Sequence, residues 1–198
     1  MLVLFKANLK LKSSLKTGSF FGTIYYMNNE LPLVRKALAL FDGRGKTAID
    51  LGCGYGRNSF FLAKNGFELV AVDKHQECLN KIKEKDVDNK IKTINADLVD
   101  FKFPQNFDFI LCTFVLHYFK KDISKKIIID AINHLNHKGI LVVALIKNQN
   151  GLSFEELEKS VKDLSTLSCI RKIIHDEPHP GAQYPHEHEV LFYIGEKF

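Results

Sequence analysis

The chain has 198 residues, of which 45% are hydrophobic and 26% charged, and its formal net charge is +5. This composition is typical of one soluble globular domain, too short for two catalytic domains and not basic enough for a protein dedicated to nucleic acid. The longest apolar runs, 109–116 and 140–146, are far shorter than the roughly 20 residues of a membrane helix, so we expect no membrane partner.

The first segment, residues 1–29, carries several lysines and no acidic residue. Its leucines follow neither the helical nor the strand period, and no signal-peptide pattern is clear. We therefore expect an N-terminal arm or cap over 1–29, followed by a single domain over 30–198. A surface arm or capping helix is the first interpretation, and a mobile lid over the active site or a membrane-surface segment are the alternatives.

From residue 30 onward, segments with helical spacing alternate with short apolar strands, separated by glycine and asparagine signals. This alternation predicts an α/β fold with a mostly parallel sheet, helices on both of its faces, and ligands beyond the carboxyl ends of the strands. We predict helices over Leu33–Phe41, Asn58–Lys64, Glu77–Lys85, Ser124–Leu135 and, with Ser153 as N-cap, Phe154–Leu164, and strands over Ala48–Leu51, Glu68–Val72, Ile91–Asn95, Phe107–Cys112, Ile140–Ile146, Cys169–Ile174 and Val190–Gly195.

The four cysteines are widely spaced and form no C-x-x-C pair. This pattern argues against a disulfide scaffold and against a zinc module, and it indicates a reducing, cytoplasmic location.

A glycine-rich turn, Asp50-Leu51-Gly52-Cys53-Gly54-Tyr55-Gly56, joins the first predicted strand to the next helix. Glycine permits a tight turn and lets a ligand approach the backbone where no Cβ intervenes. Dinucleotide-binding turns have the spacing G-x-G-x-x-G, but here Arg57 stands where the third glycine would be, and the Gly-Lys-Ser/Thr of a P-loop is absent. The turn therefore favours a nucleoside without phosphates, whose carboxylate can face the following helix N-terminus.

Two further carboxylates follow the next strands. Asp73 directly follows the predicted strand Glu68–Val72, about 20 residues after the glycine turn. A carboxylate at this place can accept hydrogen bonds from both ribose hydroxyls. Asp97 follows Ile91–Asn95 and is placed to accept from an adenine amino group, with Leu98 against the ring. Aspartate is also common in turns, so Asp97 gains its meaning from the other two sites.

The glycine turn, Asp73, Asn95-Ala96-Asp97 and Phe107-Asp108-Phe109-Ile110 resemble, in order, the motifs of class I S-adenosylmethionine-dependent methyltransferases. The resemblance runs from about residue 30 to the C-terminus. It implies a Rossmann-like seven-stranded sheet with the last strand antiparallel and S-adenosylmethionine as cofactor. Asp50 and the glycines would hold its methionine part, Asp73 the ribose and Asp97 the adenine. The expected cofactor site comprises Asp50, Gly52, Cys53, Gly54, Arg57, Asn58, Asp73, Lys74, Asp97, Leu98 and Thr113.

Within this class the chain is most similar to the tellurite-resistance methyltransferases, through Gly56-Arg57-Asn58-Ser59 and a histidine shortly before the C-terminus. His179 falls on the position of that family's proposed catalytic histidine. The chain departs from the family at Pro180, where the family has an arginine, and at His186, which replaces a second one. Arginine side chains bind oxyanions well, and this chain lacks both of these arginines. A chalcogen oxyanion, as in the family, and a thiol are therefore both open as acceptors.

Two histidines are candidates for catalysis. The cofactor carries the reactive methyl group, so the protein must align the acceptor, exclude water and, for some acceptors, remove a proton. Histidine suits that proton transfer near neutral pH. His117 follows the fourth predicted strand, beside the expected methyl position, and His179 lies in a polar insert between the last two strands. A packing role for His117 and a surface-loop role for His179 are the alternatives.

The same insert gathers His175, His179, His186 and His188 with interleaved glutamates. His186-x-His188 could ligate a metal from alternate positions of a strand. The spacing matches no known zinc signature, however, and these methyl transfers do not generally need a metal. We therefore expect a polar substrate pocket and no metal.

The acceptor we expect is a small molecule, and the motifs of nucleic-acid methylation are absent: no Asn/Asp-Pro-Pro-aromatic segment follows the fourth strand, and no Pro-Cys pair occurs. An RNA or protein acceptor and a non-catalytic, S-adenosylmethionine-binding regulator are the alternatives. For the oligomeric state, a monomer and a homodimer both remain open.

Overall fold

The computed structural model describes residues 30–41, 43, 45–176 and 183–198. The expected N-terminal arm over 1–29 lies outside these residues. Within them, no helix combines the length and the apolar character that crossing a membrane would require.

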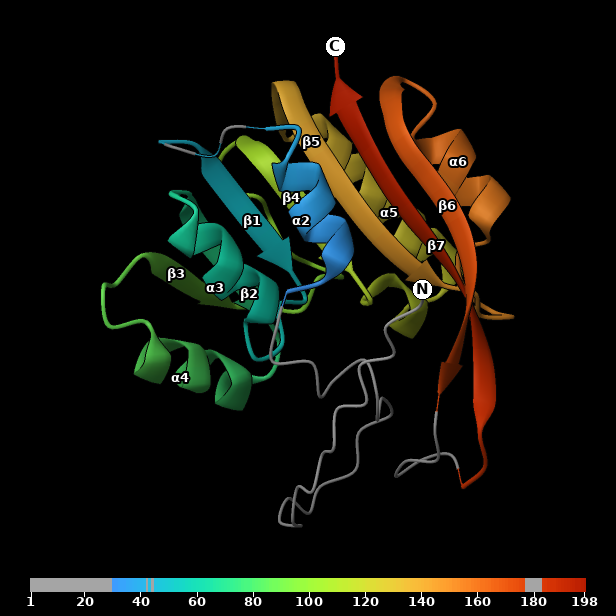
Figure 1. Ribbon diagram of the computed structural model, residues 1–198, viewed down its shortest axis with the longest axis horizontal. Helices are drawn as coiled ribbons and strands as arrows, with labels where there is room; N and C mark the ends of the chain where they lie inside the picture. Colours follow the sequence, from blue (N-terminus) through green and yellow to red (C-terminus); the bar gives the residue numbers. More distant parts are fainter. Residues whose placement is uncertain (1–29, 42, 44, 177–182) are drawn as a thin grey trace, which may run out of the picture.

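Seven strands form one sheet in the order β3-β2-β1-β4-β5-β7-β6 (Figure 1). Neighbouring strands from β3 to β5 run parallel, whereas β7 runs antiparallel to both β5 and β6. This arrangement confirms the predicted mostly parallel α/β sheet with an antiparallel last strand. The strands are β1 (Thr47–Leu51), β2 (Glu68–Asp73), β3 (Ile91–Asn95), β4 (Phe107–Thr113), β5 (Leu135–Ile146), β6 (Leu164–Asp176) and β7 (His186–Lys197).

Helices cover both faces of the sheet, as the alternating pattern predicted. Figure 1 shows α2 and α3 in front of the strands and α5 and α6 behind them. Side chains along a strand alternate between the two layers, so Ala48 packs with the helices of one face and Ile49 with those of the other. The helices are α2 (Pro32–Leu38), α3 (Arg57–Lys64), α4 (Gln76–Lys85), the short 3₁₀ turn η1 (Leu116–Tyr118), α5 (Lys121–Asn133) and α6 (Phe154–Ser160).

Pairing in the sheet shortens two predicted helices. The helix predicted to reach Leu135 ends at Asn133, because Leu135 pairs with Phe107 and opens β5. The helix predicted to reach Leu164 ends at Ser160, because Leu164 begins β6. Local helical spacing is a weak preference that strand pairing overrides.

Ser153 caps α6 as predicted. Its hydroxyl accepts a hydrogen bond from the Glu156 N–H at 3.2 Å, and the Glu156 carboxylate accepts from the Ser153 N–H at 3.1 Å. This reciprocal capping box satisfies two backbone donors that the first turn of a helix would otherwise leave exposed.

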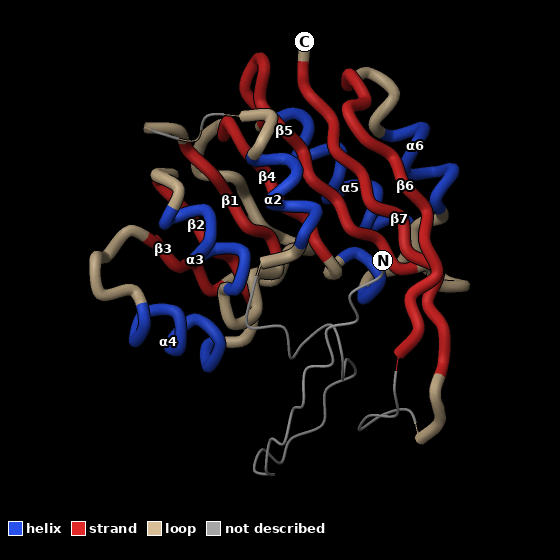
Figure 2. The backbone as a smooth tube through the Cα atoms, viewed as in Figure 1, coloured by secondary structure: helices blue, strands red, loops and turns tan. Residues whose placement is uncertain are grey.

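The hairpin of β6 and β7 reaches farther than its neighbour in the sheet. β5 ends at Ile146, which pairs with Val190, whereas β6 and β7 remain paired up to Asp176 and His186. The hairpin therefore extends past the carboxyl end of β5 (Figures 1 and 2). A register shift between Thr166 and Ser168 marks a β-bulge near the other end of β6.

Candidate active site

The glycine turn after β1 lies at the carboxyl edge of the sheet, and two of its glycines face different surroundings. Gly52 has φ +70°, and a Cβ there would come within 2.4 Å of Val115 Cγ2. Gly54 has φ +53°, and a Cβ there would meet nothing within 4 Å. Gly52 is thus required for packing inside the protein. Gly54 leaves an open side on which a ligand can approach the backbone, so the turn fits the expected cofactor.

Asp50, near the end of β1, is a buried carboxylate. Ser59 on α3 donates its hydroxyl to Asp50 Oδ2 at 2.7 Å. Burial nevertheless raises the pKa of Asp50 to about 6, against the opposing influence of this hydrogen bond and of the nearby Arg57. A carboxylate in such surroundings is stabilised by a positive charge, which fits the ammonium group of the cofactor's methionine part.

Asp73, the last residue of β2, faces the glycine turn. Its Oδ2 accepts the Gly54 N–H at 2.9 Å, and its Oδ1 accepts the His75 N–H at 2.9 Å. His75 Nδ1 also lies 2.9 Å from Oδ1, so of about four acceptor positions of an ionised carboxylate one remains, on Oδ2, for a ribose hydroxyl. The structure brings Asp73 and the turn together as the sequence predicted.

The residues expected around adenine lie where β2 and β3 end. Asp97 is exposed, and its Oδ1 accepts the Val99 N–H at 3.0 Å, which is the geometry of an aspartate turn. Leu98 is buried in the core. Lys74 is exposed, and its carbonyl accepts from the Asn95 side chain at 3.0 Å. Contacts of these residues with adenine stay predictions.

Asn58 and Thr113 form a connection inside the protein. Asn58 Nδ2 donates to Thr113 Oγ1 at 3.1 Å, and Asn58 Oδ1 accepts the Leu31 N–H at 2.9 Å. The Asn58 amide thus ties the start of α2 and the end of β4 to α3. Cys53 is held in place by its backbone, whose N–H bonds to the Val72 carbonyl at 3.0 Å. For these residues the structure shows a supporting role, which the sequence patterns did not reveal.

His117 lies in η1, directly after β4, and is buried. Its carbonyl accepts a hydrogen bond from Asn148 at 2.9 Å, which ties η1 to the segment after β5. Burial first, and then His188, lowers the pKa of His117 to about 4. Its imidazole is therefore neutral at physiological pH, the form that can accept a proton.

His179, the other candidate, lies outside the described residues. The hairpin beside it brings together a group that sequence reasoning missed, because His188 Nε2 lies 3.5 Å from Oδ2 of the buried Asp176. Asp176 also pairs with His186 across the two strands. The antiparallel register of β6 and β7 is the signal that could have revealed this group, because residues opposite each other in paired strands share a face. The influence of His188 on His117 places this group near η1.

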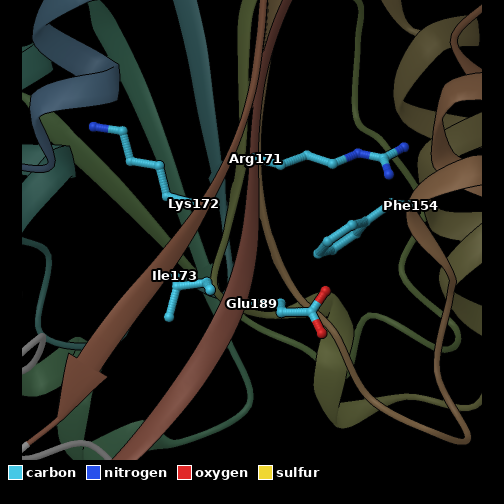
Figure 3. A pocket seen from close by; sticks show the side chains of 5 residues that line it. All are labelled: Phe154, Arg171, Lys172, Ile173 and Glu189. Atoms are coloured by element: carbon cyan, nitrogen blue, oxygen red, sulfur yellow. The ribbon is translucent and has the colours of Figure 1, made fainter.

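A small pocket lies at the β6 edge of the sheet, away from the glycine turn (Figure 3). Figure 3 shows Arg171 and Lys172 leaving β6 on opposite sides. The Arg171 guanidinium lies 5.4 Å from the centre of the Phe154 ring and donates to Glu158 at 2.8 Å. Arg171 is thus engaged by an aromatic ring and an acidic side chain at this edge. The pocket is lined by Phe154, Arg171, Lys172, Ile173 and Glu189.

Comparisons with known proteins show the family and the fold of this chain. The family model described as "Tellurite resistance protein TehB" matches residues 14–168. A probable S-adenosyl-L-methionine-dependent methyltransferase TehB of Haemophilus influenzae is 33% identical over 106 residues, 52% of this chain and 37% of that protein. A cypemycin N-terminal methyltransferase of Streptomyces is 38% identical over 66 residues, 33% of this chain and 27% of that protein.

The matched segments thus span about a third or less of these curated relatives. Among solved structures, TehB from Haemophilus influenzae superposes with a TM-score of 0.74 at 20% identity, covering 85% of this chain and 63% of that one. At this identity, the superposition shows a shared fold.

Proposed function

We propose that this chain, which belongs to the tellurite resistance protein TehB family, is an S-adenosylmethionine-dependent methyltransferase acting on a small-molecule acceptor, either a thiol or a chalcogen oxyanion. The observation that carries the proposal is the meeting of Asp50, Gly54 and Asp73 at the carboxyl edge of the sheet. Two carboxylates and a glycine with open space beside it match what a nucleoside carrying an amino-acid chain needs.

The cofactor, when bound, supplies a methyl group activated by its sulfonium. The protein's part is to bind and orient. Asp50 offers a buried negative charge to the ammonium group, and Asp73 offers carboxylate oxygens to the ribose hydroxyls. The Gly54 N–H orients the Asp73 carboxylate, and the Ser59 hydroxyl orients that of Asp50. Such pre-organisation lowers the entropic cost of aligning the acceptor with the methyl group.

The acceptor side is formed by η1 and the overhanging hairpin. A thiol acceptor must lose its proton, and His117 is neutral and can take it, although burial makes it a weaker base than an exposed histidine. An oxyanion acceptor would instead need cationic donors. Two arginines of the described chain already have acidic partners, Arg35 with Glu30 and Arg171 with Glu158. These contacts favour the thiol over the oxyanion.

A peptide amine is a second candidate acceptor. The similarity to a cypemycin N-terminal methyltransferase, 38% identity over 66 residues, favours it. That matched stretch is a third of this chain and speaks mainly for the shared cofactor chemistry, so the small molecule remains the first proposal.

Formation of S-adenosylhomocysteine by the purified chain tests the proposal. It would be measured with a small thiol, selenite, tellurite, a small amine, a peptide with a free N-terminus, and tRNA. We expect turnover with the thiol that Asp73→Asn lowers at limiting cofactor and Asp88→Asn retains, because Asp88 is an exposed residue paired with Lys90. Turnover with only peptide or tRNA would overturn the small-molecule acceptor. Cofactor binding without turnover of any acceptor would indicate a regulator.

A further inference from the structure

Three metal-ligating side chains meet on one face of the β6–β7 overhang. Asp176 and His186 are paired across the strands, and His188, two residues along β7, points to the same side. One ligand atom of each lies within 4.8 Å of the others. His175 and Glu187 alternate with them and form their own pair at 2.9 Å on the opposite face. The cluster therefore results from strand alternation and not from a crowded loop.

Asp176 is the most unusual member of this group. Its side chain is 0% exposed, and within the described part of the chain neither carboxylate oxygen accepts a hydrogen bond. His188 Nε2 lies 3.5 Å from Asp176 Oδ2, and this imidazole carries a positive charge only if it is protonated. A carboxylate removed from water without donors is costly and calls for a positive charge close by. A metal ion between Asp176 and the two histidines would supply that charge.

His186 is oriented as metal-binding histidines are. Its Nδ1 lies 3.2 Å from the Tyr184 carbonyl oxygen, which can only accept. Nδ1 therefore carries the proton, so Nε2 is the ring nitrogen that can coordinate a metal ion. A ring N–H bonded to a backbone carbonyl is the usual outer-shell contact that fixes the tautomer of a metal ligand.

We propose that Asp176, His186 and His188 bind a divalent transition-metal ion of the zinc class beside the acceptor entrance. Bonds of about 2.0–2.2 Å to a tetrahedral zinc ion place neighbouring ligand atoms roughly 3.3 Å apart. His188 Nε2 and Asp176 Oδ2 are already at 3.5 Å. Two imidazoles with one carboxylate favour zinc and its neighbours over magnesium or calcium, which prefer oxygen ligands.

Three protein ligands leave a fourth position open, as in catalytic zinc sites. The overhang passes the carboxyl end of β5, the edge at which ligands of such sheets bind, and His188 is close enough to His117 to lower its pKa. The open position can therefore take a water molecule or the donor atom of an acceptor. Metal binding itself does not depend on the proposed methyl transfer.

Titration calorimetry of zinc into the full, chelator-treated chain tests the site. We expect one tight equivalent, an affinity at least 100-fold lower in Asp176→Asn and His188→Ala, and little change in His175→Ala. His175 is the matched control, because it lies on the same hairpin, faces the other way and is 77% exposed. The exposed Cys169 could capture zinc, so the series is repeated in a Cys169→Ser background.

Thermal unfolding separates metal binding from a purely structural role. We expect zinc, but not magnesium, to raise the Tm of the wild-type chain and of His175→Ala and to leave that of Asp176→Asn unchanged. The metal-free Asp176→Asn variant should be at least as stable as wild type, because a buried charge has been removed. Absence of saturable zinc binding, or equal binding by all variants, would overturn the proposal. So would a metal-free Asp176→Asn variant that is destabilised while zinc leaves wild type unaffected, since Asp176 would then serve only as the ion-pair partner of His188.

Discussion

Gly54 donates its backbone N–H to Asp73 Oδ2 at 2.9 Å, and this bond joins the turn after β1 to the end of β2. The parallel register of the two strands brings their carboxyl ends to the same edge of the sheet. A ligand that contacts the open side of Gly54 therefore meets a carboxylate that is already oriented. Cofactor affinity should depend on both residues, and their contributions should not simply add.

Asp73→Asn should weaken S-adenosylmethionine binding while leaving the fold intact. The amide oxygen can still accept the Gly54 N–H, but the ribose hydroxyls lose a charged acceptor. Hydrogen bonds to a charged group contribute about 1.5–3 kcal/mol, so we expect roughly a tenfold to hundredfold loss of affinity by calorimetry. Asp88→Asn is the control. An unchanged affinity would contradict the role assigned to Asp73.

Alanine at Gly52 and at Gly54 should have different effects. Both positions have positive φ, which costs an L-residue about 1–2 kcal/mol. Gly52→Ala also forces a Cβ against Val115 and should lower the free energy of unfolding by about 2–4 kcal/mol. Gly54→Ala should remain folded and lose cofactor affinity by at least about tenfold, ~1.4 kcal/mol. Chemical denaturation and calorimetry measure the two effects, and full cofactor affinity in Gly54→Ala would place the cofactor elsewhere.

The free energy of unfolding of the metal-free and cofactor-free protein should depend on pH through Asp50. The pKa of Asp50 is raised to about 6 in the folded state, so its contribution to stability is fully present below the unfolded pKa and is lost as the pH rises through about 6. The raised pKa corresponds to about 3 kcal/mol at most. Asp50→Asn should therefore be more stable than wild type at pH 7, and the difference should disappear as the pH falls below the unfolded pKa of 3.8. Denaturation of both proteins across this range measures the difference, and a gap that is constant with pH would contradict it.

His117→Asn should lower turnover and leave cofactor affinity nearly unchanged. Asparagine keeps a polar side chain of smaller size but cannot accept the proton of a thiol. A general base contributes roughly 100-fold or more in rate, so kcat should fall by that order. His137→Asn, at an exposed position in β5, is the matched control. Equal kcat in both variants would reduce His117 to a packing role.

The geometry of the glycine turn and its contact with Asp73 were predictable because their signals are local. The Gly52–Gly56 spacing reports a backbone that needs left-handed φ, and strand-end aspartates report the edge of a parallel sheet. The expected contact of Asn58 with the cofactor rests on its place in Gly56-Arg57-Asn58-Ser59 and stays a prediction, whereas its structural role was not visible in the sequence. Its partners, Leu31 and Thr113, are distant in sequence and come together only in the folded chain.

The acceptor side was less predictable for a related reason. The two histidines of β7 were visible in the sequence, but Asp176 joins them only through the register of β6 against β7. The ends of α5 and α6 were misplaced because pairing of Leu135 and Leu164 in the sheet competes with helical spacing. Long-range pairing leaves no mark in a local pattern.

The β-bulge in β6 determines on which face of the sheet the side chains at each end of that strand lie. Leu164 and Asp176 are an even number of positions apart, so in a regular strand both would face the same layer. The extra residue near Leu167 reverses the alternation, and Leu164 packs toward α5 and α6 while Asp176 shares the face of His188. One strand thus contributes a leucine to the core on one side and a carboxylate to the opposite face of the overhang. A single irregular residue, far from the overhang, decides that Asp176 and not His175 lies on the face of His188.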